Sequence, residues 1–165
     1  MNTQPFHCRR RLLLGMALLP VAGFARTAAP IGVAPAALPE VQVWKEPTCG
    51  CCKDWVAHLE ANGFKVVVNM GGTDAARARL GIPQSMASCH TALVSGYAIE
   101  GHVPAREIKR LLREKPVAVG LAAPGMPIGS PGMDTPAYGG KKNPYDVILV
   151  AKGGGGTVYQ SYKGN

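Results

Sequence analysis

The sequence predicts an α/β domain, with a mixed four-stranded sheet flanked by helices and a β-hairpin added at the C-terminus. Between residues 41 and 114, short strand-like runs alternate with segments of helical periodicity. Two of these strand-like runs are separated only by a tight turn. Two more lie near the C-terminus and are joined by four consecutive glycines. A length of 165 residues suits one domain plus a short additional segment.

Residues 1–25 are typical of an export signal. The arginines at 9–11 precede an apolar run over 12–24, which glycine and proline interrupt and which is too short to span a membrane. We expect cleavage after Ala25, with Ala29 as the other possible position. The arginines also fit a twin-arginine signal, although Cys8 departs from that pattern, so general secretion stays open. The mature chain is expected in the bacterial periplasm, without a stable membrane anchor.

The net charge gives no sign of a nucleic-acid partner. The chain has 18 basic and 10 acidic residues, a net charge of +8, and removing the three leader arginines leaves 15 basic residues and +5. Most basic residues are scattered, and the one cluster has helical spacing: Arg106, Lys109, Arg110 and Arg113. A solvated helix face explains this cluster best, so no nucleic acid is expected to bind.

The mature chain begins with an Ala- and Pro-rich linker over residues 26–40, followed by the domain over 41–165. Residues 41–45 alternate apolar and polar side chains and predict a strand. Residues 51–62 have a helical apolar stripe that Gly63 ends, and a second strand is expected over 64–68. This unit places a group of cysteines at the start of its helix.

The next segments repeat the alternation. A short helix is expected over 73–80, then strands over 91–94 and 97–99 that are joined by the turn Ser95-Gly96. Pro104 opens a further helix, because a missing N–H costs nothing in the first helical turn. Residues 120–140, rich in Pro, Gly and Met, predict a loop, and runs over 145–151 and 157–162 predict the terminal hairpin.

The order of elements up to residue 114 is the thioredoxin-like pattern. In that pattern a Cys-x-x-Cys motif lies where the first helix begins, and the residue before the third strand passes beside it. Cys49 and Cys52 form the motif, and Cys89 occupies the second position, where a cis-proline is usual. We therefore expect Cys89 to face Cys49 and Cys52.

Three thiols within one helical turn, Cys49, Cys51 and Cys52, favour a soft metal. The unpaired N–H groups and the dipole at a helix N-terminus stabilise thiolates. Three sulfurs from one turn cannot all point at one ion without strain, but they can bridge several Cu(I) ions. With Cys89 added, the sequence predicts a multinuclear Cu(I)–thiolate cluster.

Other side chains could supplement the thiols. His90, beside Cys89, could be a ligand or could orient the thiolates. Met126 and Met133 carry soft thioethers in a loop that could fold over the site. His58 and His102 are not expected to be ligands, because His58 lies among core positions of a helix and His102 ends the hairpin.

Two alternatives stay open at this point. Cys49 could be the nucleophile and Cys52 the resolving thiol of a periplasmic thiol-disulfide oxidoreductase. The four mature cysteines could instead form two inert bridges in a structural or adaptor domain, since exported proteins meet an oxidising environment.

Several motifs together resemble one known family. They are Cys49 to Trp55 (Cys-Gly-Cys-Cys-Lys-Asp-Trp), Ser88 to Thr91 (Ser-Cys-His-Thr), Tyr97 to Pro104, and Gly125 to Met133 with its two methionines. In combination they are similar to the CopG-type family of bacterial copper-resistance proteins, over residues 41–165. Asp134 stands where that family usually has Glu.

The resemblance implies a periplasmic thioredoxin-like domain encoded with copper-resistance systems, whose other copper-handling proteins would be its partners. It implies a multinuclear copper cluster on Cys49, Cys51, Cys52 and Cys89. A copper oxidoreductase activity, cycling Cu(I) and Cu(II), is suggested at the level of the family. Copper binding and sequestration are the expected role, with turnover as the further possibility.

Overall fold

The structure is a computed structural model that describes residues 37–165 together with Met1. The predicted signal peptide and all but the last four residues of the predicted linker lie outside this range. Residues 37–165 form one unit. Its helices are α1 (Gly50–Ala61), α2 (Thr73–Arg79) and α3 (Ala105–Glu114). Its strands are β1 (Val41–Lys45), β2 (Val66–Met70), β3 (His90–Val94), β4 (Tyr97–Gly101), β5 (Gly120–Ala123), β6 (Tyr145–Val150) and β7 (Gly156–Tyr162).

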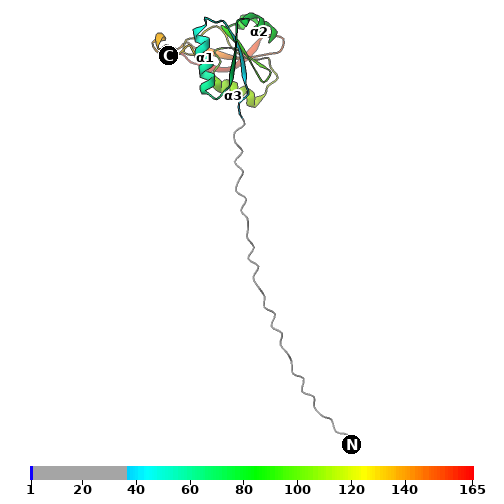
Figure 1. The fold of residues 1–165 in the computed structure, drawn as a ribbon. Helices are drawn as coiled ribbons and strands as arrows, with labels where there is room; N and C mark the ends of the chain where they lie inside the picture. The colour runs from blue at the N-terminus through cyan, green and yellow to red at the C-terminus, as the bar shows by residue number, and fades with distance from the viewer. Residues whose placement is uncertain (2–36) are drawn as a thin grey trace. The chain divides into compact units, whose positions relative to one another are not determined.

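The strands form one mixed sheet in the order β2-β1-β3-β4-β5-β6-β7. Figure 1 shows helices α1, α2 and α3 around this sheet. The pairs β1–β2 and β4–β5 are parallel, and the other four pairs are antiparallel. The expected mixed α/β class is therefore confirmed. The sheet has seven strands, however, and not four with a separate hairpin, because β5 joins the hairpin β6–β7 to β4.

The prediction of a loop over residues 120–140 is wrong at its start, where β5 lies. This strand has four small or apolar residues, all buried, and is too short to show periodicity. Gly120 is required there, because a Cβ on it would lie 1.7 Å from the carbonyl oxygen of Ala98 on β4. The sheet thus continues through a segment that only backbone packing identifies. The rest of the segment contains no further strand, only the single 3₁₀ turn Pro136–Tyr138.

The two faces of the sheet are covered by different helices. Trp55 and Leu59 of α1 and Ile108 and Leu111 of α3 belong to the larger core cluster, which includes alternate strand residues such as Val43. The opposite face carries a smaller cluster of Ile82, Ala98, Ala122 and Val150. Alternation along the strands, with a period of two residues, therefore supplies one layer to α1 and α3 and another to the region of α2.

The strand register brings three chain segments to one end of the sheet. Lys45, the last residue of β1, pairs with His90, the first residue of β3. Thr91 of β3 pairs with Glu100 near the end of β4. The N-terminus of α1 follows β1 after four residues. This end of the sheet is where the cysteines meet.

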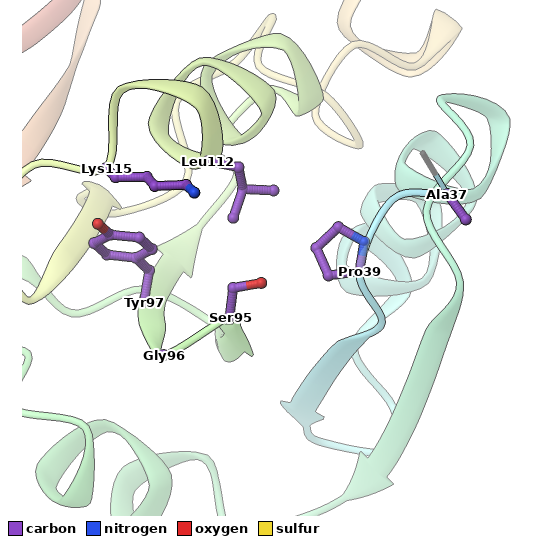
Figure 2. A pocket seen from close by; sticks show the side chains of 7 residues that line it. All are labelled: Ala37, Pro39, Ser95, Gly96, Tyr97, Leu112 and Lys115. Atoms are coloured by element: carbon purple, nitrogen blue, oxygen red, sulfur yellow. The ribbon is translucent and has the colours of Figure 1, made fainter. Parts of the chain in front are cut away.

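A cavity of about 560 Å³ lies near the opposite end of these strands (Figure 2). Its lining includes Pro39 before β1, the β3–β4 turn at Ser95 and Gly96, and Leu112 and Lys115 at the end of α3. It contains no cysteine or histidine, so its chemistry is separate from that of the thiol cluster. In the part of the chain that the structure describes, no helix has both the length and the apolar character needed to cross a membrane.

Candidate metal centre

The structure brings the four mature cysteines together. Cys49 is the N-cap residue of α1, Cys51 and Cys52 lie in its first turn, and Cys89 directly precedes β3. The four Sγ atoms all lie within 4.8 Å of one another. The position of Cys89 follows from the pairing of β3 with β1, which carries the chain past the start of α1.

The cluster is half oxidised. Cys49 and Cys52 form a disulfide, whereas Cys51 and Cys89 are free thiols. Cys51 Sγ lies 3.6 Å from Cys49 Sγ and 3.9 Å from Cys89 Sγ. Cys52 is fully buried and the other three cysteines are half-buried. Of the two bridged cysteines, Cys49 is therefore the more accessible.

The spacing of the sulfurs suits metal ligation. An ion held at about 2.3 Å from each sulfur in a tetrahedral arrangement separates neighbouring sulfurs by about 3.8 Å. The separations of Cys51 Sγ from Cys49 Sγ and from Cys89 Sγ lie close to this value. Once the disulfide is reduced, four thiolates of this spacing could share soft ions.

His102 is a site residue that sequence reasoning missed. Its Nε2 atom lies 3.1 Å from Cys89 Sγ, and its Nδ1 atom lies 2.8 Å from the carbonyl oxygen of Pro131. A carbonyl only accepts hydrogen bonds, so Nδ1 carries the proton and Nε2 directs its lone pair at the sulfur. A sequence signal existed: the two-residue turn at Ser95 and Gly96 sets the hairpin register, and that register extended outward places residue 102 opposite residue 89.

His90 completes a second group of donors. Its Nδ1 lies 3.4 Å from Cys89 Sγ, and its ring packs 4.2 Å from the ring of Trp55, centroid to centroid. Cys89, His90 and His102 offer three donor atoms within 4.8 Å of one another. Among the described residues, Nε2 of His90 has no hydrogen-bond partner. The histidine beside Cys89 therefore lies within the site, where it could ligate or orient.

Burial sets the protonation states here. It lowers the pKa of both His90 and His102, which keeps the imidazoles neutral and able to donate a lone pair. Burial, with a smaller contribution from the nearby Cys51, raises the pKa of the Cys89 thiol to about 12. Without metal Cys89 is therefore protonated, and metal binding must release its proton.

The loop over residues 125–133, called the methionine loop below, lies over the start of α1. A Cβ on Gly132 would lie 2.6 Å from the carbonyl oxygen of Cys51, so only glycine permits this close approach. Met133 is buried, with its Sδ 3.8 Å from the Tyr138 hydroxyl, whereas Met126 is 53% exposed. Met126 and Met133 are still predicted to be supplementary ligands.

His58 has a structural contact instead. Its Nε2 accepts a hydrogen bond of 3.1 Å from the backbone N–H of Ala105, at the start of α3. This contact joins α1 to α3.

A buried ion pair fixes the segment that carries Cys89. Arg77 Nε lies 2.8 Å from Glu100 Oε1, and Glu100 also accepts bonds of 2.6 Å from the Ser88 N–H and from the Thr91 hydroxyl. Arg77 donates to the Ser88 carbonyl at 2.7 Å. Both polar backbone groups of Ser88 are thus held, and Cys89 follows at once.

The fold and the site define a class: a small mixed α/β domain with a cysteine and histidine cluster that could hold a metal ion. Two solved structures, both described as copper resistance protein CopG (forms 1 and 2), are each 45% identical to this chain. They cover 76% and 77% of this chain and 98% and 99% of their own, with TM-scores of 0.70 and 0.71 for forms 2 and 1 respectively. The chain belongs to the CopG copper-resistance family, which confirms the resemblance seen in the sequence.

A family model described as a protein of unknown function, DUF411, matches residues 86–133. This segment contains Cys89, both histidines of the cluster and the methionine loop. The chain has no significant match among curated proteins.

Proposed function

We propose that this chain is an exported copper-binding protein that holds Cu(I) as a multinuclear copper–thiolate cluster in copper resistance. The observation that carries the proposal is the meeting of Cys49, Cys51, Cys52 and Cys89 within 4.8 Å at the start of α1. The identity to copper-resistance proteins supports copper as the ion. The order β2-β1-β3-β4, with α1 between β1 and β2, supports a thioredoxin-like core.

Loading of the cluster would begin with reduction of the Cys49–Cys52 disulfide by an external dithiol, which is itself oxidised to a disulfide. Thiolates select soft ions, and each sulfur can bridge two Cu(I) ions, so four sulfurs can hold several ions in a small volume. His90 and His102, and the thioethers of Met126 and Met133, would complete the coordination of ions at the edge of the cluster. Deprotonation of Cys89 on binding makes the affinity depend on pH.

Sequestration is the proposed role, with cycling between Cu(I) and Cu(II) as a further activity of the same cluster. The signal-like sequence at residues 1–25 supports a periplasmic location. Other periplasmic copper-handling proteins would deliver or receive the ions.

Anaerobic titration of the fully reduced mature protein with Cu(I) tests the proposal. We expect two or more ions per chain, and a lower stoichiometry after Cys51→Ser, because this substitution removes a bridging sulfur. Binding of fewer than two ions, or an unchanged stoichiometry in the Cys51→Ser variant, would contradict the cluster.

A thiol-disulfide oxidoreductase is the second candidate, favoured by the disulfide itself. Cys49 is half-buried, whereas Cys52 is fully buried. A groove of about 320 Å³ beside Cys49 is lined by residues that include Pro47, Val68 and Met70. Such a groove could receive an extended peptide next to the reactive sulfur. Insulin reduction that survives both Cys51→Ser and Cys89→Ser would favour this candidate. Loss of copper binding in the same variants would not count against the oxidoreductase.

The structural alternative, with two inert bridges, predicts no free thiols. Cys51 and Cys89 are free in the structure. Counting thiols in protein purified without reductant separates the cases: two free thiols per chain agree with the single bridge, and none would agree with two bridges.

A further inference from the structure

We propose that the disulfide-bonded chain keeps a second, smaller metal site on Cys89, His90 and His102. This site takes one ion of borderline softness, of which Zn(II) is the type. It shares Cys89 with the proposed copper cluster and so rests on the proposed function of this pocket. The Cys49–Cys52 bridge decides which of the two sites exists.

The donor spacing carries the proposal. A tetrahedral ion with sulfur at about 2.3 Å and nitrogen at about 2.0 Å separates those ligands by about 3.5 Å. Cys89 Sγ lies 3.1 Å from Nε2 of His102 and 3.4 Å from Nδ1 of His90. The three donor atoms of Cys89, His90 and His102 all lie within 4.8 Å of one another. None of these atoms belongs to the disulfide.

His102 has the surroundings of a metal ligand. Its Nδ1–H donates to the Pro131 carbonyl at 2.8 Å, which fixes the ring and leaves Nε2 as the only lone pair. Both imidazoles are fully buried. A set of one sulfur and two imidazole nitrogens favours one borderline ion over a cluster of Cu(I), which prefers sulfur.

Reduction changes the donor set. An external dithiol supplies two electrons and two protons, the Cys49–Cys52 bond breaks to give two thiols, and the dithiol becomes a disulfide. Four sulfurs are then within 4.8 Å of one another, and the same pocket can hold several soft ions. The oxidised protein would thus keep the Cys89 thiol protected by one ion until it is reduced.

Titration with Co(II), a spectroscopic substitute for Zn(II), tests the smaller site. The protein is purified without reductant, kept under inert gas and shown to contain two free thiols per chain. We expect one equivalent of Co(II) to produce a sulfur-to-cobalt charge-transfer band, and one equivalent of Zn(II) to abolish it. Absence of the band, or binding with no sulfur signature, would overturn the proposal.

Variants assign the donors. Cys89→Ser should abolish the band, and His102→Gln, which can still bond to Pro131, should weaken Co(II) binding by at least about tenfold. Circular dichroism checks that each variant is folded. The double variant Cys49→Ser/Cys52→Ser is the matched control, because it lacks the bridge but keeps every proposed donor: it should still bind one Co(II). Loss of binding in this control, or unchanged affinity in both His102→Gln and Cys89→Ser, would overturn the assignment.

The same double variant separates this site from the copper cluster. After reduction it should bind fewer Cu(I) ions than the unsubstituted chain, while its Co(II) binding persists. If the reduced chain takes fewer than two Cu(I) ions but the oxidised chain takes one Co(II), the proposed cluster fails and the smaller site stands. If the reduced chain takes two or more Cu(I) ions but the oxidised chain takes no Co(II), only the smaller site fails.

Discussion

Arg77 and Glu100 form a buried ion pair, with Nε and Oε1 2.8 Å apart, behind the segment that carries Cys89. The pair joins α2 to β4, and both partners also bond to Ser88. The side chains of Arg77 and Glu100 are 4% and 0% exposed. The thiol is therefore positioned by charges that water does not reach.

Replacing Arg77 with Met should lower the free energy of unfolding by about 3–5 kcal/mol, because it leaves the Glu100 carboxylate buried without its partner. Urea denaturation measures this loss. Arg113→Met is the control, since Arg113 is exposed on α3 and the change should be within about 0.5 kcal/mol. Equal effects of the two substitutions would show that the pair does not hold the fold.

Gly120→Ala should disrupt the pairing of β4 with β5. The new Cβ would lie 1.7 Å from the Ala98 carbonyl oxygen, a distance that only movement of the strands can relieve. We expect a large loss of stability or insoluble protein, measured by thermal unfolding and by recovery in the soluble fraction. Gly50→Ala is the comparison, because nothing lies within 4 Å of its added Cβ and alanine favours a helix. A soluble Gly120→Ala protein with unchanged Tm would show that the β4–β5 contact is looser than described.

Gly132→Ala should weaken metal binding by lifting the methionine loop from α1. Gly132 has a φ of +83° and its added Cβ would lie 2.6 Å from the Cys51 carbonyl oxygen. Gly140→Ala has the same kind of backbone strain, with a φ of +78°, but nothing within 4 Å. Lower Cu(I) affinity in Gly132→Ala than in Gly140→Ala assigns the effect to the loop contact. Equal Cu(I) affinities of the two variants would show that the methionine loop is not part of the metal site.

Acid should destabilise the metal-free protein. Burial lowers the pKa of His58, His90 and His102, so these residues are neutral when folded but take up protons near pH 6.5 when unfolded. Stability is therefore fully present above pH 6.5 and falls as the pH drops toward the folded pKa values, by up to about 1.4 kcal/mol per pH unit for each histidine. Thermal unfolding at pH 7.5 and 5.5 measures the slope, and His102→Gln should reduce it. A Tm independent of pH in this range would contradict the assignment.

Much of the first half of the fold could be predicted from the sequence. The strand over 41–45 was predicted with its observed bounds, and α1 within one residue, because apolar periodicity and glycine breaks mark both. The second strand begins at Val66 and not at residue 64, since Phe64 enters the core before the strand pairs with β1. The strand β5 could not be predicted, because its four residues have no period and its identity depends on backbone contact with β4.

The candidate metal site could also be predicted only in part from the sequence. The approach of Cys89 to the helix follows from the order of elements, which local patterns reveal. His102 was missed because it was judged by its place at the end of a hairpin, although the turn at residues 95–96 fixes which residue faces Cys89. The half-oxidised state could not be predicted, because spacing alone allows one bridge, two bridges or none.

The sulfurs of Cys52 and Cys89 come from positions 37 residues apart, and the methionine loop closes over the same spot. An ion shared between them acts as a reversible crosslink, which ties the start of α1 to the sheet and removes freedom from the unfolded chain. The loaded protein should therefore outlast the empty one when proteases are present. Copper supply would then regulate not only what the protein carries but also how long each molecule survives.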